Sequence, residues 1–344
     1  MALLEVRHLN VNFRLKNVEL AALIDISFSL KQGERLAFVG ESGAGKSVLG
    51  FSIVNLISKP GYIASGSIRL KDQELTHLSN RQMRHIRGKR IAMIFQDPMM
   101  TLNPVLTIGI QMVEAIRSHS KINYQDAKRI VLDKLHQVQI ASPESRFDQY
   151  PHELSGGMRQ RVIIATALLM TPDIIIADEP TTALDVTIQA EILELLQQIC
   201  KESNVALILI SHDLGVVSRI AERTIVMYAG RIVEEGPTLE IINDPQHPYT
   251  QGLLNALPQM TLPGQRLNQI QGVMPSLVDR PTGCAFHPRC PYAMEKCRQA
   301  PPEFIYNGIS HVACYMVEDM LAHDASDSDD LAEQTKIPRQ EEGR

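Results

Sequence analysis

The sequence predicts an α/β protein of the P-loop type, with a largely parallel sheet at its core and a smaller cysteine-containing extension. Three short apolar runs are typical of buried strands: Leu36–Val39, Ile174–Ala177 and Ala206–Ile210. A glycine-rich loop follows the first run and leads into an apolar helix. Between the second and third runs, apolar residues recur along one face of a helix. Strand, helix and strand in this order favour parallel strands that are covered on both faces.

The composition is that of an ordinary globular protein and excludes several classes of function. The 344 residues are 44% hydrophobic and 21% charged, with a formal net charge of −5. A chain with this charge balance has no overall positive potential that would attract nucleic acid. No apolar run approaches the ~20 residues of a membrane span, and the N-terminal MALLEVRHLN lacks the pattern of a secretory signal. We therefore expect the chain to stay in the cytosol and to meet a membrane only through a partner.

A loop of the Walker A type follows the first predicted strand. Its residues fit the pattern GxxxxGK[ST] and precede a helix, which is the context that this motif requires. The glycines let the backbone N–H groups face a phosphate, while Lys46 reaches the terminal phosphates and the Ser47 hydroxyl ligates Mg²⁺. The sequence therefore predicts that ATP and Mg²⁺ bind at Gly40, Glu41, Ser42, Gly43, Ala44, Gly45, Lys46 and Ser47.

Two adjacent carboxylates end the second predicted strand. Asp178 and Glu179 follow Ile174–Ala177, and ligands of open α/β sheets bind at that end of the strands. Phosphoryl transfer needs neutralised charge and a positioned nucleophile more than covalent chemistry. We interpret Asp178 as the acid that holds Mg²⁺, mainly through its water shell, and Glu179 as the base that orients the attacking water. The alternative is a strand-end turn with two solvated acids.

A second anion-binding helix start is predicted in the segment LSGGMRQR at residues 154–161. Gly156 and Gly157 precede a helix that opens with Arg159 and Arg161, and bare N–H groups at a helix N-terminus favour a phosphate. Two such starts, far apart in one chain, indicate that a nucleotide is held from two sides.

Together these motifs resemble the ATPase subunit of an ABC transporter over roughly residues 1–240. The resemblance implies a mixed-sheet core with a helical signature subdomain at about residues 97–165. It also implies that Ser155, Gly156 and Gly157 close over the γ-phosphate of a nucleotide that another subunit holds. The chain alone is then expected to be a poor ATPase.

Four further residues take their roles from this resemblance. His212 matches the histidine that contacts the γ-phosphate and the catalytic glutamate, and Gln96 matches the glutamine that reaches Mg²⁺ or the attacking water and couples the site to the membrane subunits. Asp185 lies in the loop that crosses to the opposite subunit. Phe13 is the candidate for stacking on adenine, with a core or edge-strand aromatic as the alternative.

The character of the sequence changes near residue 245, where a proline-rich stretch begins. Residues 247–258 and 281–293 resemble the C-terminal extension of oligopeptide and dipeptide importer ATPases, of the dipeptide or antimicrobial-peptide-uptake type. We therefore expect the ATPase domain at residues 1–245 and the extension at residues 246–322. Residues 323–344 are acidic and poor in apolar side chains, which predicts a disordered tail.

Four of the five cysteines lie in the extension, with the spacing C-x5-C-x6-C-x16-C, while Cys200 is expected only to pack. Four thiolates suit either structural zinc or a 4Fe–4S cluster. The gaps exceed the usual knuckles of a zinc ribbon, and the importer branch carries a 4Fe–4S cluster at the matching cysteines, so we favour the cluster. Zinc, a disulfide and unligated thiols are the alternatives for Cys284, Cys290, Cys297 and Cys314.

The expected function is ATP hydrolysis that energises import of dipeptides or oligopeptides across a bacterial inner membrane, at its cytoplasmic face. The resemblance implies a second ATPase subunit, usually a paralogue, two membrane-spanning permease subunits and an extracytoplasmic peptide-binding protein. Nickel chelates or glutathione are alternative cargoes. A soluble ABC ATPase that acts on the ribosome or on DNA is the alternative from another class, and the chain lacks the second cassette or long coiled-coil insertion that is typical of it.

Overall fold

The computed structural model describes residues 2–16, 18–182, 184–257 and 269–321. The contacts of the chain divide it into two compact units. The first unit comprises the described residues up to Ile232 together with Val273–Arg280, and the second comprises the described residues of Val233–Gly272 and those from Pro281 onward. The tail predicted at residues 323–344 lies outside the described residues.

Long strands near the N-terminus form an antiparallel sheet in the order β2-β1-β4-β5. The alternation in residues 3–39 of the sequence predicts short strands, and this is wrong for β1 and β2, which contain 12 and 13 residues. Register shifts between Val6 and Asn12 let β1 change its buried face without ending, as β-bulges do. The strands are β1 (Leu4–Leu15), β2 (Val18–Leu30), β4 (Gly61–Leu70) and β5 (Gln73–Glu74).

A second sheet of the first unit contains parallel neighbours in the order β9-β3-β8-β7-β6. The three apolar runs predicted as strands are confirmed as β3, β7 and β8. In the register of the sheet, Val39 pairs with Ser211 and Asp178 pairs with Ile210, so the polar strand ends meet at one edge. The strands are β3 (Arg35–Val39), β6 (Ile91–Ile94), β7 (Ile174–Asp178), β8 (Ala206–Ser211) and β9 (Arg223–Tyr228).

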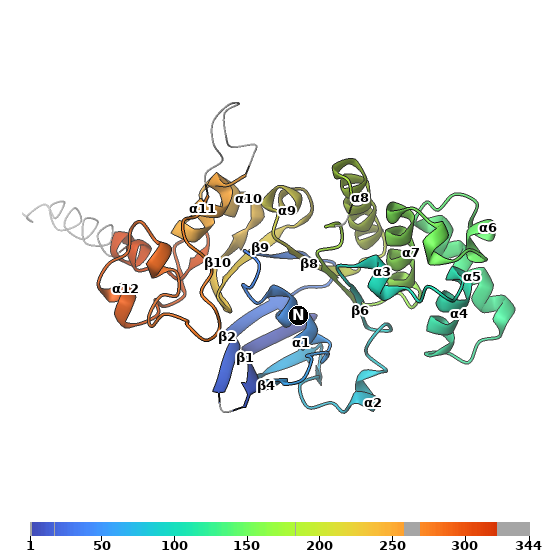
Figure 1. Cartoon of the computed structure of the whole chain (residues 1–344), viewed down its shortest axis with the longest axis horizontal. Helices are drawn as coiled ribbons and strands as arrows, with labels where there is room; N and C mark the ends of the chain where they lie inside the picture. Colours follow the sequence, from blue (N-terminus) through green and yellow to red (C-terminus); the bar gives the residue numbers. More distant parts are fainter. Residues whose placement is uncertain (1, 17, 183, 258–268, 322–344) are drawn as a thin grey trace, which may run out of the picture. The chain divides into compact units, whose positions relative to one another are not determined.

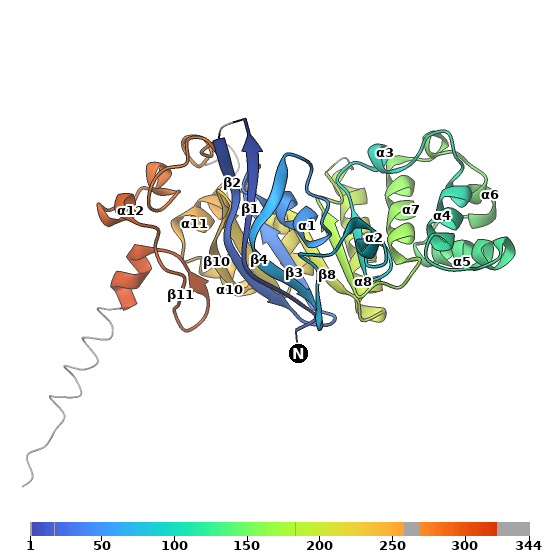
Figure 2. The same ribbon diagram turned by 90° about the horizontal axis from the view of Figure 1, so that it is seen from below.

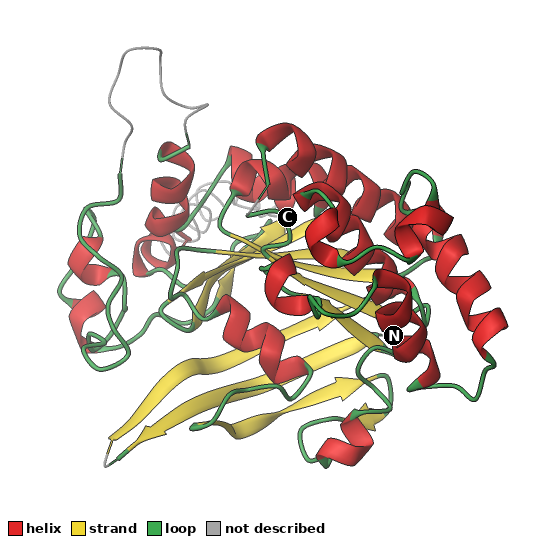
Figure 3. Cartoon of the chain, turned by 45° about the vertical axis from the view of Figure 1, so that its right-hand side comes forward, coloured by secondary structure: helices red, strands yellow, loops and turns green. Residues whose placement is uncertain are grey.

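The main core of the first unit lies between its two sheets, around helix α1 (Lys46–Ile53). Figure 2 shows α1 behind the antiparallel strands, and the cluster joins buried side chains such as Leu9, Phe38, Leu49 and Ile208. On the other face of the parallel strands lie α8 (Val186–Glu202) and α9 (Leu214–Ile220), which Figure 1 labels. Figure 3 shows a layer of helices over these strands. The parallel strands are therefore covered on both faces, as their apolar sequences predict.

Short helices follow β6 and occupy one end of the first unit (Figure 1). Residues 107–150 are mostly helical, as predicted. Within the described part of the chain, no helix combines the length and apolarity that crossing a membrane requires. These helices are α3 (Pro98–Thr101), α4 (Ile108–Arg117), α5 (Tyr124–Gln137), α6 (Pro143–Phe147), the 3₁₀ turn η1 (Pro151–Glu153) and α7 (Gly156–Leu168). The four-residue helix α2 (Asn80–Met83) precedes β6.

The second unit contains little regular structure, in agreement with its weak periodicity. Strand β10 begins at the boundary between the units, and the strand order is β11-β12-β10 with antiparallel pairing. Its elements are β10 (Arg231–Pro237), α10 (Thr238–Asn243), α11 (Pro248–Asn255), the 3₁₀ turn η3 (His287–Arg289), α12 (Lys296–Gln299), β11 (Ile305–Tyr306) and β12 (His311–Val312).

Candidate functional site

The glycine-rich loop links β3 to α1 in the arrangement that the motif predicts. Gly40 requires its glycine, because a Cβ there would lie 2.3 Å from the carbonyl oxygen of Met227 and its φ is +150°. Lys46 is buried, and its Nζ donates to the carbonyl oxygens of Gly40 at 2.7 Å and Glu41 at 3.0 Å. The lysine therefore spans the concave side of its own loop, where a phosphate would replace these carbonyl partners. Burial lowers the pKa of Lys46, and the nearby Glu179 and Asp178 carboxylates oppose that shift.

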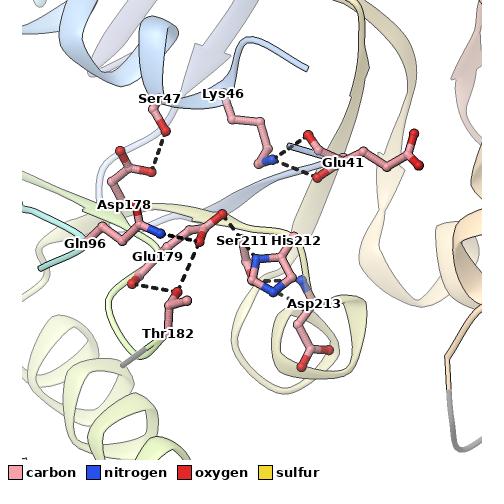
Figure 4. A network of polar contacts seen from close by, with 11 residues as sticks. Glu41, Lys46, Ser47, Gln96, Asp178, Glu179, Thr182, Ser211, His212 and Asp213 are labelled. Atoms are coloured by element: carbon pink, nitrogen blue, oxygen red, sulfur yellow. Dashed lines mark hydrogen bonds and ion pairs between the residues drawn. The ribbon is translucent and has the colours of Figure 1, made fainter. Parts of the chain in front are cut away.

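A hydroxyl and a carboxylate meet at the start of α1, where Ser47 Oγ donates to Asp178 Oδ1 at 3.0 Å (Figure 4). Asp178 is only 4% exposed, and burial raises its pKa. Two hard oxygen donors beside a buried lysine and a phosphate loop fit the preferences of Mg²⁺, which binds through one or two carboxylates and substrate phosphates. The structure thus brings together two of the three residues that the sequence assigns to Mg²⁺, while the third, Gln96, donates to Glu179 instead.

Glu179 is the centre of a polar network at the carboxyl ends of β7 and β8. Gln96 Nε2 donates to Glu179 Oε2 at 3.0 Å, and His212 Nδ1 lies 3.1 Å from Glu179 Oε1. Thr182 Oγ1 donates to Glu179 Oε2 at 3.1 Å, and Figure 4 shows all three side chains around the carboxylate. The side chain of His212 is 56% exposed, whereas that of Glu179 is 17% exposed. The network therefore holds a mostly buried carboxylate beside a more exposed imidazole.

The backbone of Glu179 adopts a conformation that is unusual for a residue with a side chain. Its φ is +45°, and its N–H donates to the carbonyl oxygen of Ile210 at 2.9 Å. Strained backbone of this kind costs of order 1–3 kcal/mol and is common where function requires a particular side-chain direction. The turn directs the Glu179 carboxylate toward Gln96 and His212 while Asp178 stays in the strand (Figure 4).

The segment LSGG begins helix α7 and leaves its first residues accessible. Ser155 is the N-cap, its Oγ accepting from the N–H of Met158 at 3.3 Å, and both Ser155 and Gly156 are exposed. Gly157 is buried against α8, and a Cβ there would lie 2.8 Å from Ile188. An exposed, capped N-terminus on a helix of thirteen residues is suited to an anion that comes from outside the chain.

The two arginines of this segment serve the internal structure. Arg159 Nε donates to the carbonyl oxygen of Pro151 at 2.7 Å. Arg161 donates to the carbonyl oxygen of Val138 at 2.9 Å and pairs with Glu191 at 3.3 Å. Both guanidinium groups are thus engaged within the chain, and the helix start itself carries the anion-binding capacity.

Two other predicted residues lie apart from the Glu179 network. Asp185 is exposed and is the N-cap residue of α8. Phe13 pairs with Gly61 across β1 and β4, and its half-buried ring packs on the apolar core beside that glycine. Since this packing is also what an ordinary strand aromatic shows, stacking on adenine stays a prediction.

The four clustered cysteines line one small cavity of the second unit, together with His247 and Phe286. All five cysteines of the chain are free thiols, which argues against the disulfide alternative. Burial raises the pKa of Cys284 to about 11, and it raises the pKa of Cys290 and Cys314 as well. Among the described residues no three acidic, histidine or cysteine side chains stand close enough to hold a metal ion. Cys200 is buried in α8, where burial raises its pKa to about 12, and it packs as expected.

An open, mainly apolar groove lies in the first unit next to the segment that carries Gln96. Phe95 contributes to it and stacks on Phe51 at a centroid distance of 6.2 Å. The opposite wall comes from α4 and α7 and the residues just after α7, through side chains that include Ala115, Ile163 and Met170. The groove therefore shares a wall with the residue that precedes Gln96.

Sequence reasoning missed Thr182 and the backbone turn at Glu179. The signal for the first was present in Glu179–Thr182 (EPTT), because a hydroxyl three residues after a carboxylate reaches it when the chain turns sharply. The left-handed conformation had no signal, since it is unusual for glutamate.

Comparisons with known proteins show which families the chain is similar to. Residues 23–182 match the family model described as ABC transporter, and residues 233–297 match the model described as oligopeptide/dipeptide transporter, C-terminal region. A dipeptide transport ATP-binding protein DppD from Haemophilus influenzae is 50% identical over 315 residues, covering 92% of this chain and 96% of that protein. The DppD of Bacillus subtilis is 48% identical over 324 residues, covering 93% and 96%.

The fold is also found in solved structures, among them MJ0796 and CbiO1. The dimeric ATP-binding cassette MJ0796 bound to ADP and Pi has a TM-score of 0.61 at 26% identity, covering 68% of this chain and 98% of that one. CbiO1 from Clostridium perfringens has a TM-score of 0.61 at 28% identity, covering 71% and 91%.

Proposed function

Because the chain belongs to the ABC transporter ATPases, in the branch with the oligopeptide/dipeptide C-terminal region, we propose that it hydrolyses ATP to drive import of dipeptides or oligopeptides. The relatives that support this are dipeptide transport ATP-binding proteins matched over nearly their whole length. The observation that carries the catalytic part is the carboxylate of Glu179, held by Gln96, His212 and Thr182 next to the phosphate loop.

Each residue of the site has a separate role in the proposed phosphoryl transfer. Lys46 is freed from the carbonyl oxygens of its own loop when a phosphate enters, and it then binds the terminal phosphate oxygens. Mg²⁺, when bound by Ser47 and Asp178, neutralises phosphate charge. Glu179 accepts a hydrogen bond from the attacking water and orients it, while Gln96 and Thr182 keep the carboxylate in place. His212 closes the solvent side and contacts the γ-phosphate.

A second ATPase subunit completes each site in this proposal. Ser155 and Gly156 are exposed at the start of α7, so their N–H groups and hydroxyl are available to a nucleotide on a partner. The MJ0796 cassette, which shares the fold, is a dimer in its solved structure. We propose that Asp185 lies at the same interface and that the partner is a paralogous chain.

The groove beside Gln96 is the proposed docking place of a permease subunit. A short cytoplasmic helix of the permease, apolar on one face, would fit between Phe95 and the side chains of α4 and α7. The contact would place the permease one residue from the Gln96 that binds Glu179, which gives a short route for coupling. It would also hold the chain at the cytoplasmic face of the inner membrane, next to permeases that receive peptides from an extracytoplasmic binding protein.

We propose a 4Fe–4S cluster for Cys284, Cys290, Cys297 and Cys314. All four cysteines line one cavity, and four thiolates are the donor set that such a cluster takes. The spacing of the four cysteines is wider than the close pairs of cysteines that are usual in zinc ribbons. When bound, the cluster supplies cross-links among loops that have little regular structure. Anaerobic purification with assays for iron, sulfide and zinc tests this, and zinc without sulfide would contradict it.

The decisive test of the function uses the assembled transporter in sealed vesicles. Glu179→Gln should abolish ATP-driven uptake of a radiolabelled dipeptide and stop ATP turnover, while ATP stays bound. An exposed control, Asp72→Asn, should leave uptake unchanged. Turnover that persists in Glu179→Gln would show that the base is another group, and ATP hydrolysis that ribosomes or DNA stimulate without any dipeptide uptake would favour the soluble alternative.

A further inference from the structure

A segment of the C-terminal extension packs with the nucleotide-binding unit. Val273–Arg280, here called the strap, belongs to the first unit by its contacts, although the residues before and after it belong to the second. Nothing in the motifs of the nucleotide site requires a contribution from this part of the chain. The reason for its position is found in the residues that it touches.

One contact of the strap is with the phosphate loop itself. Met274 packs on the apolar core and lies against Gly43, whose Cβ, if present, would be 3.8 Å from Met274 Cγ. Gly43 has φ +87°, so it stands at a turn of the loop that few other residues could adopt. Met274 thus supports the loop at one of its turns.

The second contact is made by Arg280 at the base of the loop. Its Nη2 donates to the carbonyl oxygen of Ala21 at 2.8 Å, and it lies 3.1 Å from the position of a Cβ on Gly230. Burial lowers the pKa of Arg280, and the neighbouring Arg231 adds to that shift. The guanidinium is therefore held in a partly desolvated position beside the turn between β9 and β10.

The backbone that Arg280 holds is the backbone on which the phosphate loop rests. The N–H of Gly230 donates to the carbonyl oxygen of Ala44 at 2.9 Å. The N–H of Ile24 donates to the carbonyl oxygen of Gly230 at 2.8 Å. Gly45 packs so closely on Ala22 and Gly230 that a Cβ would lie within 3.4 Å of both backbones. Arg280 therefore acts on the loop through two neighbours, without touching it.

Both ends of the strap are fixed within the cysteine-bearing unit. Before it, Arg289 Nε donates to the carbonyl oxygen of Gln271 at 2.9 Å. After it, the N–H of Cys284 donates to the carbonyl oxygen of Cys297 at 2.8 Å. The strap is thus a short length of chain whose flanking residues are anchored in the second unit and whose own contacts are with the first.

We propose that the strap positions the phosphate loop, so that Met274 and Arg280 are positioning residues for nucleotide binding and the C-terminal extension sets the nucleotide affinity. The physical reason is preorganisation, since a loop that binds phosphate through backbone N–H groups loses affinity when it must first be ordered. The inference rests on the nucleotide-binding function proposed above.

The test measures binding of ADP and of a non-hydrolysable ATP analogue, with Mg²⁺, to the purified full chain by calorimetry. Arg280→Ala should raise the Kd roughly tenfold, which corresponds to a loss of about 1.4 kcal/mol in binding free energy. Arg280→Lys should keep most of the wild-type affinity, because the ammonium group can still donate to the carbonyl oxygen of Ala21. Met274→Ala should raise the Kd of the otherwise wild-type chain by about threefold. Val278→Ala is the matched control, since Val278 lies in the strap but is 70% exposed.

In the assembled transporter the same variants should raise the KM for ATP and leave kcat near the wild-type value, whereas a general loss of folding lowers both the rate and the binding. Thermal melting identifies any variant that fails to fold. If Arg280→Ala fails to fold, the nucleotide affinities of Arg280→Lys and Met274→Ala test the proposal in its place. Affinities within about twofold of wild type in folded Arg280→Ala and Met274→Ala chains would overturn the proposal. Absence of nucleotide binding by the wild-type chain would instead overturn the proposed function.

Discussion

At the scale of single residues, the site depends on how one carboxylate is held. Glu179 accepts hydrogen bonds from Gln96 and Thr182 and faces His212, and its backbone is turned out of the strand that holds Asp178. Two adjacent acids thereby acquire different environments, one buried beside a hydroxyl and one at the solvent edge. The proposed division of roles, in which Asp178 holds Mg²⁺ and Glu179 orients water, requires such a separation.

Replacing Thr182 with valine should lower kcat for ATP hydrolysis and leave the KM for ATP unchanged. The valine removes one hydrogen bond to Glu179 Oε2, worth about 1 kcal/mol or roughly fivefold in rate. Steady-state ATPase assays on the assembled transporter measure the effect. Thr182→Ser keeps the hydroxyl and should retain near wild-type turnover, so equal losses in the two variants would assign Thr182 a different role.

Replacing Asp178 with asparagine should stabilise the nucleotide-free chain while it removes Mg²⁺-dependent turnover. Burial raises the pKa of Asp178, so the folded chain carries a carboxylate whose ionised form is disfavoured. The unfolded carboxyl titrates near ~4, and the cost of the buried charge therefore grows as pH rises from that value through the raised pKa of the folded carboxyl.

The gain in stability of Asp178→Asn should be of order 1 kcal/mol at neutral pH and should shrink as pH falls toward ~4. Thermal melting of the chain without nucleotide, followed across this pH range, measures it. The exposed Asp185→Asn is the control and should not change the melting temperature. A stabilisation by Asp178→Asn that stayed constant with pH would mean that the buried charge is not its cause.

At the scale of elements, helix α7 begins with one exposed glycine and one buried glycine, which follow each other directly in the sequence. Gly156 is exposed, with Leu184 at 3.3 Å from a Cβ position, while Gly157 is buried with Ile188 at 2.8 Å. The pattern of the sequence identified both residues as a helix start, yet it could not distinguish them, because only the position of α8 decides which glycine is covered.

The two glycines should therefore respond differently to alanine. Gly157→Ala must displace Ile188 and should lower the free energy of unfolding by about 1–3 kcal/mol. Gly156→Ala should leave stability unchanged within about 0.5 kcal/mol, yet it should prevent ATP-dependent association with the partner ATPase by blocking a phosphate at the helix N-terminus. Denaturant unfolding and size-exclusion chromatography with ATP in a Glu179→Gln background give the two readouts. Normal association of Gly156→Ala would contradict the partner role of this helix start.

At the scale of the whole molecule, the sequence predicts local motifs well, but it does not predict contacts between residues that lie far apart along the chain. The phosphate loop and the two acids that end β7 are recognisable because each directly follows an apolar strand. Gln96 and His212 meet at the same edge because the strands before them are parallel, which the apolar runs predict. Met274 and Arg280 leave no such mark in the sequence, because they lie far along the chain from the loop that they support.

The contacts of the strap illustrate the limit in physical terms. The hydrogen bond from Arg280 to Ala21 joins residues that are 259 positions apart, and Met274 reaches Gly43 across a similar distance in sequence. Neither contact follows from periodicity or from a motif, because both depend on where the extension returns to the first unit. The same holds for the cavity that the four cysteines line, whose donors the sequence identifies but whose convergence only the fold provides.

The strap also joins the cysteine cavity to the nucleotide site along the chain. If the four cysteines hold a cluster that cross-links their unit, then Cys284→Ser should release the end of the strap that follows Arg280. Nucleotide binding by the full chain should weaken by about threefold or more, in parallel with loss of iron, because a loosened strap no longer orders the phosphate loop. Iron analysis and calorimetry with ADP on the same samples measure both quantities.

Cys200→Ala is the control for this coupling, since that buried thiol packs in α8 and should change stability without changing iron content. If this variant lost as much nucleotide affinity as Cys284→Ser, the cause would be a general destabilisation of the fold and not release of the strap. A Cys284→Ser chain that loses its iron and binds nucleotide as tightly as wild type would separate the two sites, because the strap would then hold the loop without help from the cysteines.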